Sequence, residues 1–192
     1  MVNVVIFASG SGSNAEKIME RFKEHDTVKV QAVFANSAKA GVLDRATRFG
    51  IPTYVFNRTA FYETDEVLNQ LEKFETDLVV LAGFLWLVPE NLLGEKFDIV
   101  NIHPGLLPKF GGPGMYGMNV HRAVKAANEK KSGMTIHFVN NEYDKGEIIF
   151  QASCDLEPED SPEKIAERVL ELEHKYYPQV IEDLALKRIK NK

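Results

Sequence analysis

Short apolar segments and amphipathic segments alternate along the first half of the chain. The apolar segments are rich in β-branched residues, which is typical of parallel strands that are buried on both faces. They comprise residues 2–8, 30–35, 52–56, 78–82 and 99–102. Between them, apolar residues recur at helical spacing, and the expected helices comprise residues 14–23, 40–49 and 61–75. This order of strands and helices predicts a parallel sheet with helices on its faces.

The pattern changes after residue 103. In order, the next expected elements are a glycine-rich loop at 110–117, a helix at 120–128, strands at 135–139 and 147–154, and a helix from 162 to 173. Ser161 suits the N-cap of that last helix, with Pro162 at its first position. Two strands joined by a turn segment indicate antiparallel pairing in this half.

The two halves together predict one domain spanning residues 1–192. Its class is α/β: a Rossmann-like three-layer sandwich with a parallel N-terminal half and a mixed or antiparallel C-terminal half. In open sheets of this kind, ligands bind at the carboxyl ends of the strands. Ser9, Gly83, Asn101 and His103 all fall at such ends.

Composition narrows the classes of function. The 192 residues carry a net charge of −5, and no Lys/Arg-rich run occurs before the tail at 187–192, which argues against a nucleic-acid partner. A strand begins at residue 2, leaving no room for a signal peptide, and no apolar stretch approaches the length of a membrane span. Cys154 is the single cysteine. We therefore expect a cytoplasmic protein with small-molecule partners; the sequence does not indicate its oligomeric state.

Three polar residues are candidates for catalysis. Asn101 and His103 end an apolar strand that stops at Pro104, and the two-residue period of a strand points both side chains to one face. Asp144 lies in the turn segment between the last two expected strands. An amide, an imidazole and a carboxylate can stabilise an oxyanion and move a proton. The alternative is a polar pair at a strand end and an ordinary turn aspartate.

The loop at residues 9–15, Ser-Gly-Ser-Gly-Ser-Asn-Ala, follows the first strand and opens a helix. It formally matches the dinucleotide motif G-x-G-x-x-[G/A], but the second strand ends at Asn36 where that fold needs an acid. The backbone and hydroxyl groups of this loop at a helix N-terminus favour a phosphate group instead. A simple tight turn would account for Gly10 and Gly12.

Other histidines could suggest a metal site with His103 and Asp144. No metal-binding spacing supports one, so we expect no metal. His137 alternates with apolar neighbours and is interpreted as a hydrogen-bonded histidine that supports the site or the strand. His121 is expected on the surface of its helix.

Several segments resemble those of the folate-dependent formyltransferases. The run Asn-Ile-His-Pro-Gly-Leu-Leu-Pro-Lys-Phe at 101–110 is similar to that family's signature, and the runs at 79–85 and 136–139 resemble two further segments in the same order. The likeness extends from the Ser9 loop to Glu173. It is strongest to members that formylate 5-phosphoribosylglycinamide (GAR) with 10-formyltetrahydrofolate in purine biosynthesis.

The resemblance implies a role for individual residues. The catalytic residues of the family map onto Asn101, His103 and Asp144. The implied GAR-binding residues are Ser11, Gly12, Ser13, Asn14 and Glu173. The implied folate-binding residues are Leu85, Trp86, Leu87, Val88, Asn101, Asn140, Asn141 and Asp144. Trp86 would otherwise be a core or rim aromatic, and Glu173 an ordinary charge on a helix face.

The sequence departs from the family pattern in three places. Thr64 lies where many relatives carry a basic residue that helps to hold the substrate phosphate; Arg58 or Lys109 would have to replace it here. The 110–117 loop is longer and richer in glycine, which suggests a mobile flap. Gly105 replaces a serine that is common in the family.

Two other functions stay open. One is formylation of another amine, such as methionyl-tRNA or an amino sugar, and the other is a phosphate-binding module without activity.

Overall fold

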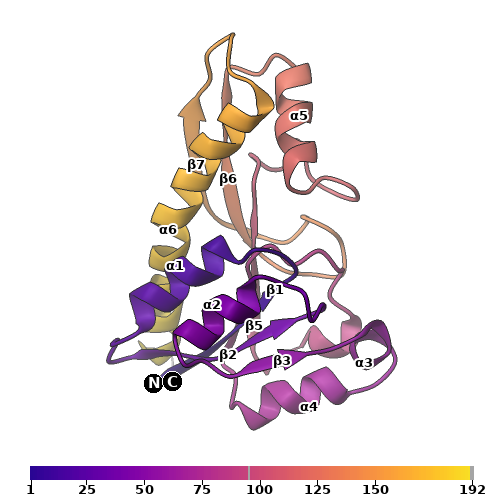
Figure 1. The fold of residues 1–192 in the computed structure, drawn as a ribbon, viewed down its shortest axis with the longest axis vertical. Helices are drawn as coiled ribbons and strands as arrows, with labels where there is room; N and C mark the ends of the chain where they lie inside the picture. The colour runs from indigo at the N-terminus through magenta and orange to yellow at the C-terminus, as the bar shows by residue number, and fades with distance from the viewer. Residues whose placement is uncertain (95, 191–192) are drawn as a thin grey trace.

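The computed structural model describes residues 1–94 and 96–190, and its central feature is a seven-stranded sheet (Figure 1). The strand order is β3-β2-β1-β4-β5-β6-β7. The strands are β1 (Val2–Ala8), β2 (Val28–Ala35), β3 (Thr53–Val55), β4 (Leu78–Leu81), β5 (Asp98–His103), β6 (Lys131–Phe138) and β7 (Ile148–Asp155). Strands β1 to β5 pair in parallel, whereas β6 and β7 pair antiparallel. The predicted fold class is therefore confirmed.

Helices cover both faces of the sheet. They are α1 (Ser13–Phe22), α2 (Val42–Arg48), α3 (Arg58–Tyr62), α4 (Glu66–Lys73), α5 (Met118–Ala126) and α6 (Pro162–Lys190), with a 3₁₀ turn, η1 (Glu90–Leu92). One apolar cluster joins the sheet to α1, α2, α5 and α6, and the other joins it to α3 and α4. The result is the three-layer sandwich that the sequence predicts. No helix of the described ranges has both the length and the apolar character of a membrane span.

Two helix predictions were wrong in extent. The helix expected at 61–75 is two short helices, because Asn57 caps α3 by accepting a hydrogen bond from the Ala60 N–H and a turn at residues 63–65 separates α3 from α4. The last helix does not end at Glu173. It continues to Lys190 because its buried apolar positions continue through Ile181 and Ala185.

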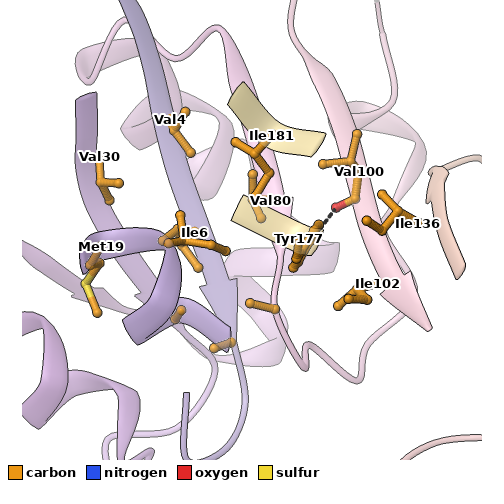
Figure 2. Packing of buried hydrophobic residues seen from close by; sticks show 14 of the residues in the cluster. Val4, Ile6, Met19, Val30, Val80, Val100, Ile102, Ile136, Tyr177 and Ile181 are labelled. Carbon is orange, nitrogen blue, oxygen red and sulfur yellow. Dashed lines mark hydrogen bonds between the residues drawn. The ribbon is translucent and has the colours of Figure 1, made fainter. Parts of the chain in front are cut away.

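Tyr177 fixes α6 against the middle of the sheet (Figure 2). Its side chain is fully buried, and its hydroxyl donates to the Leu81 carbonyl at 2.9 Å and to the Val100 carbonyl at 3.4 Å. These two carbonyls belong to the neighbouring strands β4 and β5. Because Asn101 directly follows Val100, the same contact helps to hold the strand end that carries the candidate site.

Candidate active site

A cavity of about 680 Å³ opens at the carboxyl ends of the central strands. Its wall combines parts of the chain that are distant in sequence. They are the loop after β1 (Ser11, Asn14), residues 83–88 after β4, the end of β5 (Asn101, His103), the glycine-rich loop with the start of α5, the end of β6 with the loop that carries Asp144, and the face of α6 with Glu173. The predicted location at the strand ends is confirmed.

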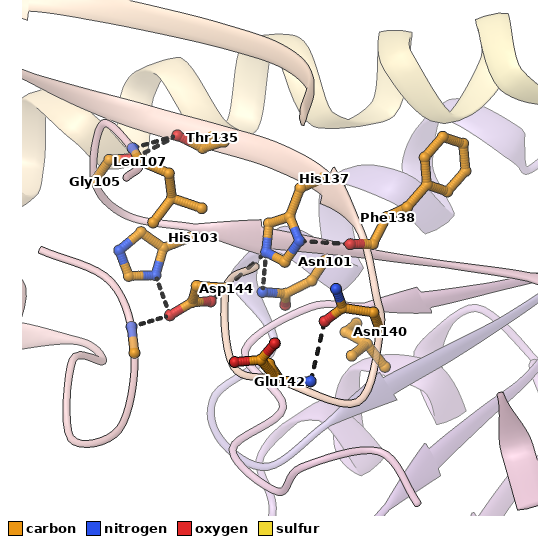
Figure 3. Close-up of polar contacts among 12 residues, drawn as sticks. Asn101, His103, Gly105, Leu107, Thr135, His137, Phe138, Asn140, Glu142 and Asp144 are labelled. Atoms are coloured by element: carbon orange, nitrogen blue, oxygen red, sulfur yellow. Dashed lines mark hydrogen bonds and ion pairs between the residues drawn. The ribbon is translucent and has the colours of Figure 1, made fainter. Parts of the chain in front are cut away.

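His103 lies between two oxygen acceptors, of which Figure 3 shows Asp144. Its Nδ1 is 3.4 Å from Oδ2 of Asp144, and its Nε2 is 2.8 Å from the carbonyl oxygen of Phe110. The Gly112 N–H donates to the same Asp144 oxygen at 2.8 Å. Only the imidazolium form of His103 can donate from both nitrogens at once, so both oxygens act to stabilise the charged form of the ring.

Burial opposes that charge. The His103 side chain is almost completely enclosed, and desolvation holds its pKa below the ordinary value of 6.5, although the Asp144 charge and the Phe110 carbonyl act to raise that pKa. Desolvation also acts to raise the pKa of Asp144, but His137, His103 and the Gly112 N–H together outweigh it and lower that pKa. Asp144 is therefore the stable anion of the pair, and it sets how readily His103 is protonated.

Asn101 is oriented by a cross-strand neighbour. In the antiparallel pairing of β5 with β6, Asn101 lies directly opposite His137, which places both side chains on one face. The His137 Nδ1 donates to the Phe138 carbonyl at 2.7 Å, so in the neutral ring Nε2 is free to accept from the Asn101 amide nitrogen at 3.1 Å. This confirms the interpretation of His137 as a hydrogen-bonded histidine beside the site.

The loop after β1 is built for close packing. Gly12 adopts φ +78° as the N-cap of α1, and a Cβ there would lie 2.5 Å from Cγ2 of Val42. The loop is tied to the rest of the site by the Ser9 hydroxyl, which accepts from the Leu85 N–H at 3.2 Å. Ser11 and Asn14 line the cavity, whereas Gly12 and Ser13 form the turn behind them.

Glu173 and Asn14 meet across this end of the cavity. The Asn14 side-chain amide donates to Oε2 of Glu173 at 2.6 Å, and Glu173 is only 7% exposed. Burial raises the pKa of Glu173 to about 7, although the Asn14 hydrogen bond acts to lower it. Two polar groups, one of which titrates near neutral pH, are thus presented to whatever occupies this end.

An aromatic cluster forms the opposite end. Trp86 packs against Phe56, Phe61 and Phe84 with ring centroids 5.6–6.2 Å apart, so it is a rim aromatic that also lines the cavity. The segment at residues 85–88 runs along the cavity wall, with Leu85 exposed and Val88 buried. An apolar slot with accessible backbone suits a planar heterocycle.

Some expected contacts are not made. Asn140 and Asn141 border a separate shallow hollow beside β5 rather than this cavity, and Asn140 accepts the Glu142 N–H within its own loop. Arg58 stacks over Tyr62 and Trp86, and Lys109 pairs with Glu129, so neither reaches the loop after β1.

A basic side chain that contacts that loop is one that the sequence analysis did not single out. Arg45 of α2 donates from Nε to the Ser11 carbonyl at 2.8 Å and pairs with Glu16. His121, expected on the surface, is buried at 5% exposure and lines the cavity. One signal for this burial is present in the sequence: His121 lies three residues before Val124 and therefore on the same face of α5.

Within residues 1–94 and 96–190, no group of three or more His, Cys, Asp or Glu side chains is arranged to hold a metal ion. Asp144 is the one carboxylate that contacts His103 and His137 there.

Comparison with known proteins assigns the class. The model of the formyl transferase family matches residues 2–181, and the chain belongs to this family. The matched range contains every strand of the sheet and all the candidate site residues.

Particular relatives carry a more specific name. The chain is 40% identical to the chloroplastic phosphoribosylglycinamide formyltransferase of Arabidopsis thaliana over 97% of its own length and 66% of that protein's length. It is 37% identical to the phosphoribosylglycinamide formyltransferase of Bacillus subtilis over 96% of this chain and 95% of the relative. The crystal structure of the Anaplasma phagocytophilum enzyme of that name superposes with a TM-score of 0.87 at 36% identity, covering 96% of this chain and 87% of that one.

Proposed function

We propose that this protein is a phosphoribosylglycinamide formyltransferase, which transfers the formyl group of 10-formyltetrahydrofolate to the amine of GAR in purine biosynthesis. The observation that carries the proposal is the contact of His103 with Asp144 in the cavity that Asn101, the loop after β1 and Trp86 also line. The relatives that bear this name match over almost the whole of the present chain.

The reaction needs two donors and one proton relay. Attack of the GAR amine on the formyl carbon forms a tetrahedral intermediate whose oxygen carries negative charge. The amide of Asn101 and the imidazolium of His103 donate hydrogen bonds to that oxygen as the charge develops. The C–N bond to folate then breaks as a proton moves from the attacking nitrogen to the leaving nitrogen, with His103 as general acid. Attack is direct, so no covalent enzyme intermediate forms.

Asp144 has the supporting role in this scheme. Its carboxylate stabilises the charged imidazole against the desolvation that opposes it. His103 must exchange its bond to the Phe110 carbonyl for one to the substrate, which couples the glycine-rich loop to the reacting group. This coupling is consistent with the proposal that residues 110–117 act as a flap.

The two ends of the cavity accommodate the two substrates. Ser11, Gly12, Ser13 and Asn14 are proposed to bind the GAR phosphate at the N-terminus of α1, with Glu173 binding the ribose hydroxyls. The proposed folate contacts are Leu85, Trp86, Leu87 and Val88, together with Asn101 and Asp144. Asn140 and Asn141 would contribute through the loop that carries Asp144.

The test is formyl transfer from 10-formyltetrahydrofolate to GAR, measured beside methionyl-tRNA and an amino sugar. We expect transfer to GAR alone, abolished in His103→Ala, and unchanged by EDTA because hydrogen-bond donors suffice for the oxyanion. Transfer to another amine instead would replace the substrate assignment. A rate that EDTA removes and one divalent metal restores would contradict the metal-free mechanism.

A further inference from the structure

Arg45 is a partly buried cation that contacts the proposed phosphate loop. It lies in α2, which packs beside α1 (Figure 1). Its Nε donates to the carbonyl oxygen of Ser11 at 2.8 Å, and a terminal guanidinium nitrogen pairs with Glu16 of α1. Ser11 lines the cavity, whereas none of the described α2 residues does. Arg45 therefore contacts the loop from outside the cavity.

The carbonyl groups of residues 10–12 all have hydrogen-bond donors. Two of these donors are backbone N–H groups, that of Val42 at 3.1 Å and that of Glu16 at 2.9 Å. The third donor is the Arg45 side chain, which bonds the Ser11 carbonyl. Of the three bonds, the one from Arg45 is thus the bond that a side-chain substitution can remove.

The N–H groups of the same loop lack acceptors. None of those at residues 11–14 donates to an acceptor among the described residues. A peptide unit is planar and trans, so its C=O and N–H groups point in opposite directions. Because the Ser11 carbonyl is directed to Arg45 on α2, the Gly12 N–H of the same peptide points away from α2. That N–H is therefore available to a ligand.

The arginines of α2 also limit the negative charge beside the loop. Glu16 lies in the first turn of α1, where an uncompensated carboxylate would repel an anion. Arg45 and Arg48 both pair with it, the second at 3.0 Å. The Arg48 side chain is 64% exposed and makes no hydrogen bond to the loop within the described residues. Arg48 therefore shares the charge pairing of Arg45 without its contact with Ser11.

We propose that Arg45 is a positioning residue that fixes the Ser11–Gly12 peptide, so that the Gly12 N–H is presented to the phosphate of GAR. This inference rests on the proposed function and assigns the basic residue on which the phosphate site depends. Arg45 acts through the Ser11 carbonyl and not by touching the phosphate. A helix N-terminus binds an anion most tightly when its N–H groups are oriented before the ligand arrives.

The test compares Arg45→Met with a matched control, Arg48→Met, on GAR and on an analogue that lacks the 5-phosphate. Methionine keeps much of the apolar stem of arginine but cannot donate a hydrogen bond. We expect Arg45→Met to raise KM for GAR by roughly 10- to 100-fold, the value of one hydrogen bond to a charged group, and to change kcat by less than about 3-fold. For the phosphate-free analogue, kcat/KM should change by less than about 2-fold, because the Gly12 N–H has no phosphate to bind.

Two further variants separate the Ser11 contact from charge. Arg48→Met removes a cation from the same carboxylate, and KM for GAR should stay within about 3-fold of the wild-type value because exposed ion pairs contribute little. In Arg45→Lys the ammonium can still donate to the Ser11 carbonyl, so KM should return to within about 5-fold of the wild type.

Three outcomes would overturn the inference. The first is an Arg45→Met enzyme with the wild-type KM for GAR. The second is an equal rise of KM in Arg48→Met, which would make charge the cause. The third is an equal loss of kcat/KM with the phosphate-free analogue, which would make the effect a general one on the fold.

A measurement on the wild-type protein covers the case in which variants at residue 45 do not fold. The amide proton of Gly12, assigned in ¹⁵N-labelled protein, should move downfield on addition of GAR or inorganic phosphate and not on addition of the phosphate-free analogue. No shift at saturating GAR overturns the inference while GAR formylation stands. A wild-type protein that neither binds nor formylates GAR overturns the proposed function together with it.

Discussion

The protonation of His103 depends on its burial, which lowers its pKa, and on the carboxylate beside it, which offsets part of that effect. Desolvation disfavours the imidazolium, and Asp144 at 3.4 Å is the charge that favours it. The backbone N–H of Gly112 holds that carboxylate in place. His103, Asp144 and Gly112 thus come from three different segments of the chain. Replacing Asp144 or displacing Gly112 changes the protonation of His103.

Asp144→Asn should lower turnover by about 100- to 1,000-fold, the usual cost of losing one oriented donor to an oxyanion. Loss of the negative charge lowers the pKa of His103 further, so the remaining activity should shift toward lower pH. The variant should fold, because residue 144 has φ +58°, a conformation that asparagine adopts readily. Turnover against pH is the measurement, with the exposed Asp155→Asn as control; normal turnover at neutral pH would remove Asp144 from the mechanism.

Glu173 gives a second prediction, on stability. Its pKa is about 7 in the folded protein, against the ordinary glutamate value of 4.5. Folding is therefore most favoured at low pH, where both states are protonated, and loses stability as the pH rises from 4.5 to 7. Glu173→Gln should be more stable than the wild type at pH 8, by about 3 kcal/mol at most from about 1.4 kcal/mol per pKa unit. The two proteins should unfold alike at pH 4.

The control for this experiment is Glu171→Gln, two residues away on the exposed side of α6. It should leave the pH dependence of unfolding unchanged. If Glu173→Gln and the wild type were equally stable at pH 8, ionisation of the buried Glu173 carboxyl would not lower the free energy of unfolding, and the prediction would be wrong. GAR affinity, measured in parallel, should fall in Glu173→Gln because an amide accepts ribose hydroxyl bonds less strongly than a carboxylate.

At the scale of single elements, the loop after β1 depends on one glycine. Gly12 has a positive φ, and its missing Cβ leaves room for Val42 of α2. Gly12→Ala should therefore weaken GAR binding by at least about 10-fold and destabilise the protein by about 1 kcal/mol or more. The obstacle is packing against α2, so a larger residue does not need to touch the ligand to disturb the loop.

Gly10→Ala is the matched control in the same loop. A Cβ at residue 10 would meet no atom within 4 Å, and the backbone there does not have a positive φ. GAR affinity and stability should both stay close to wild type. If Gly10→Ala and Gly12→Ala lowered GAR affinity and stability equally, the contact with Val42 would not be the cause of the loss.

The sequence predicted the five parallel strands well, because their apolar runs are short and largely continuous. It began β6 at residue 135 instead of 131, because Lys131, Ser132 and Gly133 are not large apolar residues. It failed where local signals were weak. Helix α6 passes Pro178, which is a stop signal in isolation, because Tyr177 and Ile181 gain more from burial against the sheet. His121 was placed on the surface because one helix read alone does not show that α6 covers its outer side.

For the candidate site, the sequence indicated individual residues but not the contacts between them. Asn101 and His103 follow from strand periodicity, and the nearness of Asp144 follows from the resemblance. The contact between His103 and Phe110, and the pairing of Asn101 with His137, depend on the loop conformation and on the antiparallel register, which local sequence does not determine.

At the scale of the whole molecule, Tyr177 joins the last helix to two central strands. Tyr177→Phe should lower the free energy of unfolding by about 1–2 kcal/mol, because it removes a buried hydrogen bond to the Leu81 carbonyl. Urea denaturation is the measurement. Tyr176→Phe is the control, since its ring packs on Phe150 and its hydroxyl makes no hydrogen bond within the described residues. Equal losses in the two variants would remove the special role of Tyr177.

The position of α6 in the chain also bears on how the protein is made. All seven strands precede α6 in the sequence, yet α6 packs on β1 and β6 and on α1 (Figure 1). During synthesis, the apolar face that α6 covers is complete before the helix that shields it has emerged from the ribosome. The growing chain therefore passes through an interval in which Val4, Val80 and Val100 have no cover from α6. Chaperone binding should be strongest in that interval, before Tyr177 can close the sandwich.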